Sequence, residues 1–333
     1  MKILIFEYIT GGGLAKQPLP ESLLCEGEMM SRALIEDLLE INDTELIVTR
    51  DYRLPLNEAL KAEHITAITI TPESDIDKLL LNLANKCDAV WPIAPETDDT
   101  LYNVCRLFES SNTALLSSCS DVVKIAGDKM ATYQLLKAHG IPVVQTYLLN
   151  DKYDIQKHQS WLIKPIDGVG CEGVRKFSRD QITTLPSSDR LILQPFIEGR
   201  SLSLSCLFFR GQGQLICVNE QLIKQSNGQF LLEGCEVNIN IDKQMYLQLV
   251  AQIAIIMPML WGYIGIDLIE IDPGPLVLEI NPRLTTSYTG IKSALGVNIA
   301  ACVLDLINNK MAELKFSSNK QIAISISGAA SAD

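Results

Sequence analysis

The sequence is poor in histidine and in positive charge. It has 3 histidines among 333 residues, and its 9 cysteines are scattered without a CxxC pair. This pattern argues against a zinc site and a disulfide framework, so we interpret the cysteines as small buried side chains in a reducing compartment. The formal net charge is −12 at pH 7. Because phosphate backbones need a broad basic face, we expect no nucleic-acid partner, and any anion site must be local.

Leader-like and membrane-like segments are also scarce. The N-terminal run MKILIFEY meets an acidic residue at Glu7, and it lacks the long apolar stretch and cleavage site of a signal peptide. Residues 245–266 contain no charge, but Gln248, Pro258 and Gly262 interrupt the run. This favours a helix laid over a sheet, followed by a buried strand, over a membrane span. We therefore expect a cytoplasmic protein without a membrane partner.

The first third of the chain alternates between strand-like and helix-like segments. Strands are expected at 2–9, 45–49 and 88–93, and helices at 28–40, 76–86 and 99–110. This alternation predicts a parallel sheet with helices on both faces, a Rossmann-like domain. The run Gly11–Gly13 is not a dinucleotide fingerprint, since Lys16 stands at the third glycine position. A loop that closes over a substrate and an ordinary flexible turn both remain open for it.

The remaining chain predicts a mostly antiparallel architecture of α/β (α+β) class. A polar segment at 111–120 suggests a crossing between domains, and a helix is expected from Asp128 to Ala138. Short connections predict antiparallel pairing in the segments that follow: strands at 143–148, 161–165, 173–177, 191–196, 202–209 and 214–218, a helix at 244–259 and a hairpin at 264–281. We predict three parts: a Rossmann-like domain (1–115), a central lid (116–190) and a C-terminal domain (191–333).

A glycine-rich turn follows a predicted buried strand that ends near Lys164. The turn contains Gly168, Gly170 and Gly173. A lysine at a strand end, beside several free backbone N–H groups, supplies what a triphosphate needs. The spacing differs from a Walker A loop, because no Gly-Lys-Ser/Thr sequence follows. Taken alone, the segment is better explained as a flexible hairpin with a surface lysine.

The predicted C-terminal hairpin carries two acidic residues that should face each other. An Asp-Pro-Gly turn with three loop residues would place Ile271 opposite Pro275, and hence Asp267 opposite Glu279. Asn281 lies two residues further along and shares their face. Opposed carboxylates repel unless a cation lies between them, and such oxygen ligands suit Mg²⁺. A shift of one residue would send Asp267 to the other face, so the prediction depends on the turn.

Arg283 follows this acidic group directly, and the hydroxyl-rich run 285–289 comes after it. An arginine beside a metal site can hold a developing oxyanion or a phosphoryl oxygen, while hydroxyls can orient a polar substrate. The alternative, a surface arginine in a Ser/Thr-rich loop, is disfavoured by the adjacent acidic residues. Glu96 follows a predicted strand end, where substrate contact and a helix-dipole role are both open.

Taken together, these motifs resemble the ATP-grasp ligases over roughly residues 88–310. The resemblance rests on motifs in a fixed order: Asp128-Lys129, Ile163-Lys164-Pro165 before the glycine turn, Gln194-Pro195-Phe196-Ile197-Glu198-Gly199, Gly265-Ile266-Asp267 and Glu279-Ile280-Asn281-Pro282-Arg283. It implies an ATP-grasp fold, with a Rossmann-like N-terminal domain, a central lid and a C-terminal antiparallel ATP-binding domain.

The resemblance also implies roles for individual residues. Lys129 and Lys164 would bind ATP phosphates, with Lys164 also catalytic, and the loop with Gly168, Gly170 and Gly173 would close over them. Adenine would meet the segment Gln194, Pro195, Phe196 and Ile197, chiefly through the backbone groups of Gln194 and Ile197. The metal ligands would be Asp267, Glu279 and Asn281, holding one or two Mg²⁺ ions, with Mn²⁺ as an alternative. Arg283 would be catalytic at the reacting carboxyl group. Ser201 stands where a ribose-binding carboxylate is common, which leaves the ribose contact open.

Within the superfamily, the segments 6–13 and 281–288 look like the group that includes the tyramine–glutamate ligase of methanofuran biosynthesis. That likeness implies an ADP-forming ligase of one-carbon metabolism that activates L-glutamate as an acyl phosphate and couples it to tyramine or a similar primary amine. The expected partners are small molecules, with a homodimer suggested by analogy.

Rival functions are less well supported by the residues. Other ATP-grasp reactions, a dipeptide ligation or a carboxylase step, remain open alternatives. A non-catalytic nucleotide sensor is disfavoured because both lysines, the three metal-type ligands and the arginine are all present. An NAD-dependent oxidoreductase fails for lack of the glycine fingerprint.

Overall fold

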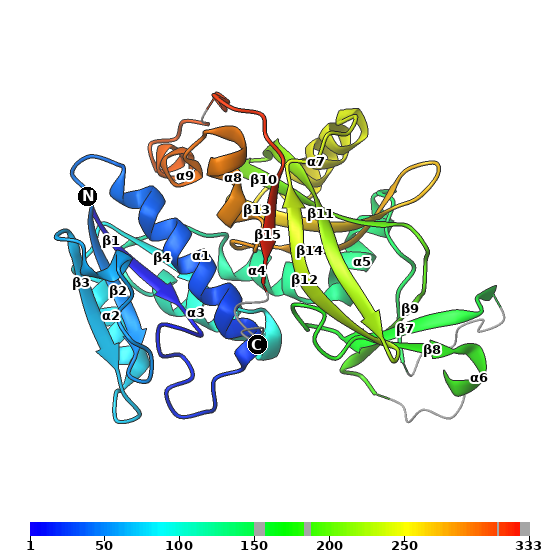
Figure 1. Cartoon of the computed structure of the whole chain (residues 1–333), viewed down its shortest axis with the longest axis horizontal. Helices are drawn as coiled ribbons and strands as arrows, with labels where there is room; N and C mark the ends of the chain where they lie inside the picture. The colour runs from blue at the N-terminus through cyan, green and yellow to red at the C-terminus, as the bar shows by residue number, and fades with distance from the viewer. Residues whose placement is uncertain (150–156, 183–187, 312, 327–333) are drawn as a thin grey trace, which may run out of the picture.

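The computed structural model describes residues 1–149, 157–182, 188–311 and 313–326. Two sheets organise the chain, and Figure 1 shows them side by side, with the N-terminal sheet in blue and cyan on the left. The second sheet lies on the right, and its green strands β7, β8 and β9 lie apart from the yellow ones. The predicted mixed α/β fold class is confirmed.

The N-terminal sheet is parallel, with the strand order β3-β2-β1-β4-β5. Its strands are β1 (Lys2–Glu7), β2 (Glu45–Asp51), β3 (Ile65–Ile70), β4 (Ala89–Ile93) and β5 (Ala114–Leu115), with helices α1 (Glu21–Leu39), α2 (Ile76–Ala84) and α3 (Thr100–Glu109) and short 3₁₀ turns at Ala59–Lys61 and Thr97–Asp99. The helix expected at 28–40 begins earlier, at Glu21, and the edge strand β3 was missed because its side chains are mostly half-exposed.

The core of this domain follows from the period of two in β1. Ile3 and Ile5 pack in one cluster with the α1 residues Met30 and Leu34. Leu4 and Phe6 point to the opposite face of the sheet and pack in a second cluster that includes residues of α2 and α3. Because alternate side chains of a strand point to opposite faces, one apolar strand supports helices on both sides of the sheet.

The glycine run after β1 forms a packed turn. The N–H of Gly11 donates to the carbonyl oxygen of Glu7 at 2.7 Å. A Cβ on Gly12, whose φ is +92°, would lie 2.4 Å from the Cβ of Ile70, and one on Gly13 would lie 2.4 Å from Tyr8. None of the three glycines lines the cavities found among the described residues. The sequence requires glycine here for close packing.

Among the described residues, the second sheet has ten strands, paired antiparallel throughout. Their bounds are β6 (Tyr147–Leu148), β7 (Ser160–Pro165), β8 (Arg175–Ser178), β9 (Leu191–Pro195), β10 (Arg200–Phe209), β11 (Gln212–Ser226), β12 (Gln229–Val237), β13 (Gly262–Glu270), β14 (Pro275–Asn281) and β15 (Ile322–Ser325). The pair Gln229–Arg175 joins β12 to β8, so strands β6 to β9 form a nearly separate part of the sheet. Strands β12 and β15 were not predicted from the sequence.

Helices cover this sheet and connect it to the first. They are α4 (Ser120–Gly127), α5 (Lys129–Ala138), α6 (Arg179–Ile182), α7 (Gln244–Ile256), α8 (Tyr288–Leu295) and α9 (Ile299–Ile307). Helix α7 packs on β11 and leads into the buried strand β13, as the sequence predicted for 245–266. In the part of the chain that the structure describes, no single helix has the length and apolar character to cross a membrane; α8 and α9 together pass that test but are bent by 105°.

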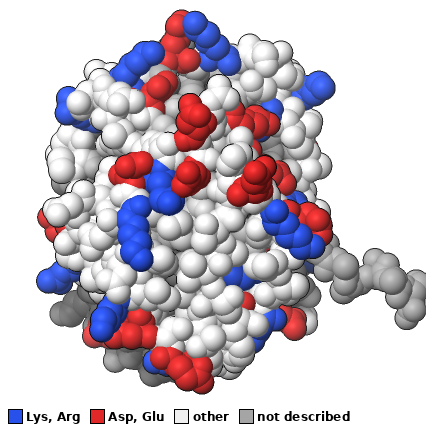
Figure 2. Space-filling model, turned by 90° about the vertical axis from the view of Figure 1, so that its left-hand side faces the viewer, with Lys and Arg blue, Asp and Glu red and all other residues white. Residues whose placement is uncertain are grey.

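The charges on the face of the molecule shown in Figure 2 are intermingled. Cationic and anionic side chains alternate over this face, with broad uncharged areas between them. Surface ion pairs of the N-terminal domain, such as Lys2 with Glu45 at 3.1 Å, follow the same pattern. Such exposed pairs contribute little to stability.

Candidate active site

A cavity of about 440 Å³ lies between strands β7 and β9 on one side and strands β10 to β14 on the other. It gathers nearly all of the residues that the sequence singled out. Those lining it are Lys129, Lys164, Gly168, Gly170, Gln194, Pro195, Phe196, Ile197, Ser201, Asp267, Glu279, Asn281 and Arg283. Gly173 does not line it; its φ is +72°, and a Cβ there would lie 2.9 Å from Pro165. Gly173 therefore shapes the loop and does not face the cavity.

The acidic pair is brought together by a hairpin whose register differs from the prediction. The turn closes on Glu270 and Pro275, so the expected pairing of Ile271 with Pro275 is wrong. A bulge directly after Asp267 takes up one extra residue of β14, and Asp267 faces Glu279 as predicted. Without the bulge, the shifted turn would have placed Asp267 and Glu279 on opposite faces of the hairpin. The extra residue returns both side chains to the same face.

Asp267 on β13 is held by two amide groups, one on β11 and one on β14. The Nε2 of Gln221 donates to its Oδ1 at 3.1 Å, and the Nδ2 of Asn281 donates to its Oδ2 at 3.1 Å. Burial and the charge of Glu279 raise the pKa of Asp267. The direct donors are neutral, so a cation bound here would favour the ionised form of this carboxylate.

Two lysines approach Glu279 from different elements. Asp128 caps helix α5 by accepting from two backbone N–H groups, and the cap places Lys129 at the start of the helix. The Nζ of Lys129 lies 2.9 Å from Glu279 and donates to the carbonyl oxygen of Gly168 at 2.5 Å. Burial opposes ionisation of Glu279, but the charges of Lys129 and Lys164 outweigh it and lower the pKa.

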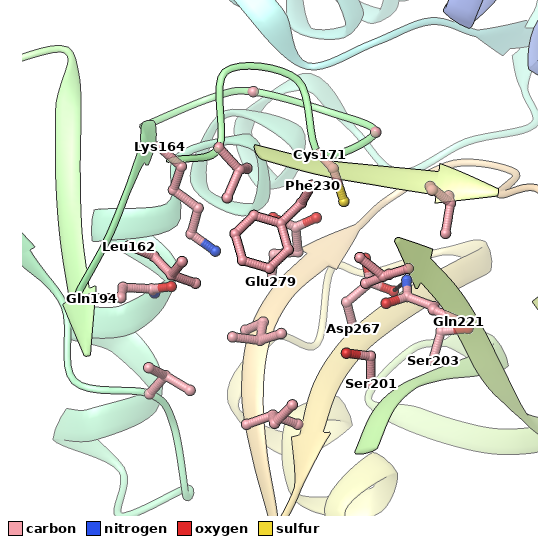
Figure 3. A pocket seen from close by; sticks show the side chains of 18 of the residues that line it. Leu162, Lys164, Cys171, Gln194, Ser201, Ser203, Gln221, Phe230, Asp267 and Glu279 are labelled. Atoms are coloured by element: carbon pink, nitrogen blue, oxygen red, sulfur yellow. Dashed lines mark hydrogen bonds between the residues drawn. The ribbon is translucent and has the colours of Figure 1, made fainter. Parts of the chain in front are cut away.

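Lys164 enters the cavity from the end of β7, and Figure 3 shows it directed toward Glu279. The residue is 8% exposed, and burial lowers the pKa of its ammonium group. A desolvated cation next to a glycine-rich loop interacts with an anionic ligand more strongly than a surface lysine would. The alternative for this segment, a flexible hairpin with a surface lysine, is disfavoured because Lys164 is buried.

The donor set at this site suits a hard divalent cation. Asp267, Glu279 and Asn281 supply two carboxylates and an amide oxygen from paired strands, which leaves positions for water and phosphate oxygens. Among the residues that the structure describes, no cluster of three His, Cys, Asp or Glu side chains forms a self-sufficient metal cage. The residues fit an ion that is shared with a phosphate ligand.

Arg283 has a partner that the sequence did not reveal. Its Nε lies 2.9 Å from Oε1 of Glu96, and its Nη2 lies 2.9 Å from Oε2, a two-point ion pair. The side chains are 13% and 5% exposed. The sequence allows Glu96 either a substrate contact or a helix-dipole role. The structure shows a third role, because the Glu96 carboxylate orients the guanidinium of Arg283. Glu96 follows β4 in the N-terminal domain and Arg283 follows β14, so this pair connects the two sheets beside the cavity.

The hydroxyl-rich run predicted to orient a substrate lines the cavity and takes part in a buried network. Ser287 and Thr285 lie 3.0 Å apart, and each is within hydrogen-bonding distance of Tyr263. Ser201 also lines the cavity, and Figure 3 shows it beside Ser203. The network fixes the backbone that carries Arg283.

Two family matches cover adjacent parts of the chain. Residues 44–123 match the family described as a pre ATP-grasp 3 domain, and residues 126–287 match the family described as an ATP-grasp domain. The chain belongs to the ATP-grasp superfamily. The superfamily predicted from the motifs is therefore confirmed, and ATP is the nucleotide to consider in the cavity.

Relatives align over nearly the whole length of this ATP-grasp chain. It is 28% identical over 318 residues to the tyramine–L-glutamate ligase of Methanocaldococcus jannaschii, covering 94% of this chain and 91% of the relative. It is 29% identical to the enzyme of the same name from Methanocaldococcus fervens, covering 94% and 96%. A crystal structure of an ATP-grasp superfamily protein from Archaeoglobus fulgidus matches with a TM-score of 0.71 and 25% identity, covering 98% of this chain and 92% of that one. The predicted enzyme class, a carboxylate–amine ligase, is confirmed.

One buried acceptor tests whether the cavity suits ATP. The Nε2 of Gln194 donates at 2.8 Å to the hydroxyl of Thr146, which itself donates to the carbonyl oxygen of Val144 at 2.9 Å. Because the Thr146 hydroxyl already donates to Val144, it must accept from Gln194, and this fixes which end of the Gln194 amide is Nε2. Oε1 of Gln194 is then buried without a partner among the described residues. An amino group on a purine base would satisfy that oxygen. The neighbouring rings of Phe196 and Phe230, 6.3 Å apart, supply apolar surface for the base.

We expect the substitution Gln194→Leu to weaken ATP binding about tenfold, because a buried hydrogen bond to the base is lost. Calorimetric titration with Mg-ATP would measure the change in Kd. The matched control is Gln214→Leu, since Gln214 also has a buried Oε1 without a partner but lies outside the cavity. Equal ATP affinity for the two variants would contradict this role of Gln194.

Proposed function

We propose that this protein uses ATP to activate L-glutamate as an acyl phosphate, then couples it to tyramine or a similar primary amine. The observation that carries the proposal is the convergence on one cavity of two lysines, an opposed acidic pair and an oriented arginine. The choice of substrates is supported by the two tyramine–L-glutamate ligases, whose sequences align over more than 90% of both chains.

In the first step, an oxygen of the substrate carboxylate attacks the γ-phosphorus of ATP and ADP leaves. Lys129 and Lys164 line the cavity and would neutralise charge on the phosphates. Asp267, Glu279 and Asn281 would hold Mg²⁺, which when bound neutralises phosphate oxygens and orients them. No side chain of the enzyme serves as a nucleophile.

In the second step, the neutral amine nitrogen attacks the acyl carbon, the bond from that carbon to the phosphate oxygen breaks, and the proton lost by the nitrogen leaves with the phosphate. Arg283 stabilises the negative charge that develops on the carbonyl oxygen. Glu96 holds the guanidinium through two of its nitrogens, so little reorientation is needed when that charge appears.

The acyl phosphate must be protected from water between the two steps. The loop with Gly168 and Gly170 lies over the cavity, and Lys129 binds its backbone at Gly168. A second tether joins this loop to the N-terminal domain, because the N–H of Asp98 donates to Asp167 at 2.8 Å. We assign the loop the role of a lid that closes over the nucleotide.

The experiment that tests the proposal measures ADP release by the purified protein with Mg-ATP and L-glutamate. Reactions with tyramine, with a panel of other amines and without an amine are compared, and the product mass is determined. We expect tyramine-dependent turnover and the mass of a glutamyl amide. Turnover that requires a different carboxylate, or the formation of a dipeptide or a carboxylated product, would contradict the substrate assignment.

Other sequence-based expectations stay predictions. They are the three-part division at residues 115/116 and 190/191, the cytoplasmic location, the homodimer and the number of metal ions. Residues 150–156 and 183–187 of the predicted lid, and 312 and 327–333 of the predicted C-terminal domain, lie outside the described residues.

A further inference from the structure

A second, smaller cavity of about 40 Å³ adjoins the first. It lies between helix α1, the ends of β1 and β4, and the glycine loop of the lid. Three residues line both cavities: Glu26, Gly170 and Arg283. The small cavity therefore opens at the point where the lid meets the predicted oxyanion-stabilising arginine. Its volume suits a small head group rather than a ring or a phosphate.

Glu26 is the carboxylate at the junction of the two cavities. Its side chain is half-buried, and the hydroxyl of Thr286 donates to its Oε2, which fixes the carboxylate beside the segment that follows Arg283. The lid closes against it, because a Cβ built on Gly170 would lie 3.5 Å from Oε1 of Glu26. A ligand bound by Glu26 would thus be covered by the same loop that covers the nucleotide.

Two carboxylates that line the small cavity, those of Glu26 and Glu7, form no ion pair in the described part of the chain. Within the described ranges, neither Glu26 nor Glu7 has a Lys, Arg or His nitrogen within 4.0 Å of its carboxylate. Arg283 forms its two-point ion pair with Glu96, and its charge reaches Glu26 only at longer range. Glu7 is 3% exposed, and its donors among the described residues are neutral groups of Ile9 and Thr10. Buried carboxylates without a cation are costly, which points to a cationic ligand.

The other walls of the small cavity are apolar. They are formed by Ile9, Leu23, Met30, Ile93, Ala94, Pro95 and Val169, together with Gly27. Gly27 leaves the space in front of Glu7 open, since a Cβ there would lie 2.8 Å from that carboxyl group. A metal ion would need further oxygen ligands that these walls do not supply. An ammonium group on a carbon stem satisfies both the charge and the apolar surroundings.

We infer that Glu26 binds the primary ammonium group of a substrate at this junction, beside Arg283. The inference rests on the proposed function and adds a specificity-determining residue to it. Two substrates carry such a group: the amino-acid carboxyl donor, through its α-ammonium group, and the acceptor amine. In either case, the bound ammonium would lie next to the carboxyl carbon at which Arg283 stabilises the oxyanion.

The test is the substitution Glu26→Gln, which keeps an acceptor for Thr286 and removes the charge. We expect the KM for one ammonium-bearing substrate to rise at least about tenfold, with the KM for ATP unchanged, because a charge-assisted hydrogen bond is lost. The arms of the assay separate the two sources. A raised KM for L-glutamate, with a reduced preference over glutarate, identifies the α-ammonium group; a raised KM for tyramine identifies the acceptor amine.

The matched control is Glu36→Gln, on the same helix, where Glu36 forms an exposed ion pair with Arg32 and lines neither cavity. This control should leave every KM within twofold of wild type. If wild type turns over both substrates and Glu26→Gln behaves like the control, the inference is overturned and the proposed function stands.

If wild type shows no turnover with L-glutamate and any amine, the proposed function fails separately. Titration of L-glutamate and tyramine into the protein with a non-hydrolysable ATP analogue then decides the inference. Tenfold weaker binding of either compound by Glu26→Gln supports it. Equal binding by the variant, or no binding by wild type, overturns it.

Discussion

Replacement of Glu279 by Gln is expected to reduce ADP formation by about 10³-fold or more, with the fold preserved. The variant removes a metal-type ligand and the counter-charge of Lys129 from the site of phosphoryl transfer. Asp267→Asn should cause a loss of similar size. Coupled ADP assays at saturating Mg-ATP would measure both effects, with circular dichroism to verify folding.

The stability of Asp267→Asn distinguishes a functional carboxylate from a structural one. Burial and the charge of Glu279 disfavour ionised Asp267, so its neutral replacement should leave the Tm unchanged or raise it in Mg²⁺-free buffer. Glu233→Gln is a suitable control, since Glu233 forms an exposed ion pair with Lys224 outside the cavity. Retention of more than a tenth of wild-type activity by either Asp267→Asn or Glu279→Gln would refute the metal-binding assignment.

The second large effect is expected for Arg283→Met. Loss of the oxyanion partner should lower turnover by about 10²- to 10³-fold. The same change leaves Glu96 buried without its cation, which should cost about 3–5 kcal/mol of unfolding free energy. Urea denaturation and steady-state assays on the same preparation would measure both quantities.

The double variant Glu96→Gln/Arg283→Met separates the two losses. Removing both charges should restore most of the unfolding free energy, because no unpaired ion is left behind, while turnover stays low. Glu96→Gln alone should be active but slower, since the guanidinium keeps its charge and loses one of its orienting contacts. A double variant with near-normal turnover would show that Arg283 serves only structure.

Several features of the site could be predicted because they depend on local rules. The opposition of Asp267 and Glu279 follows from a hairpin whose strands are adjacent in sequence. The cap at Asp128, which places Lys129, follows from side-chain chemistry within one helical turn. Even so, the predicted turn was off by one residue, and a bulge that no turn rule indicates restored the facing pair.

The contacts that complete the site join residues that are far apart in the chain. Glu96 and Arg283 are separated by 187 positions, and Glu26 and Thr286 by 260. Neither pair leaves a periodic or spacing signal, so the role of Glu96 was left open and Glu26 was not singled out. Strands β3 and β15 escaped prediction for a related reason, because their half-exposed side chains lack a clear buried face.

The sequence by itself determined the parallel and antiparallel parts of the fold, the chemical groups that line the cavity and the superfamily. Alternating apolar residues, turn residues and helix caps act over a few positions, and those signals survive in the linear chain. Only the tertiary structure decided how the N-terminal domain meets the second sheet. That packing turns Arg283 toward Glu96 and places Glu26 at the mouth of the small cavity, because burial makes each charge depend on partners that distant segments bring to it.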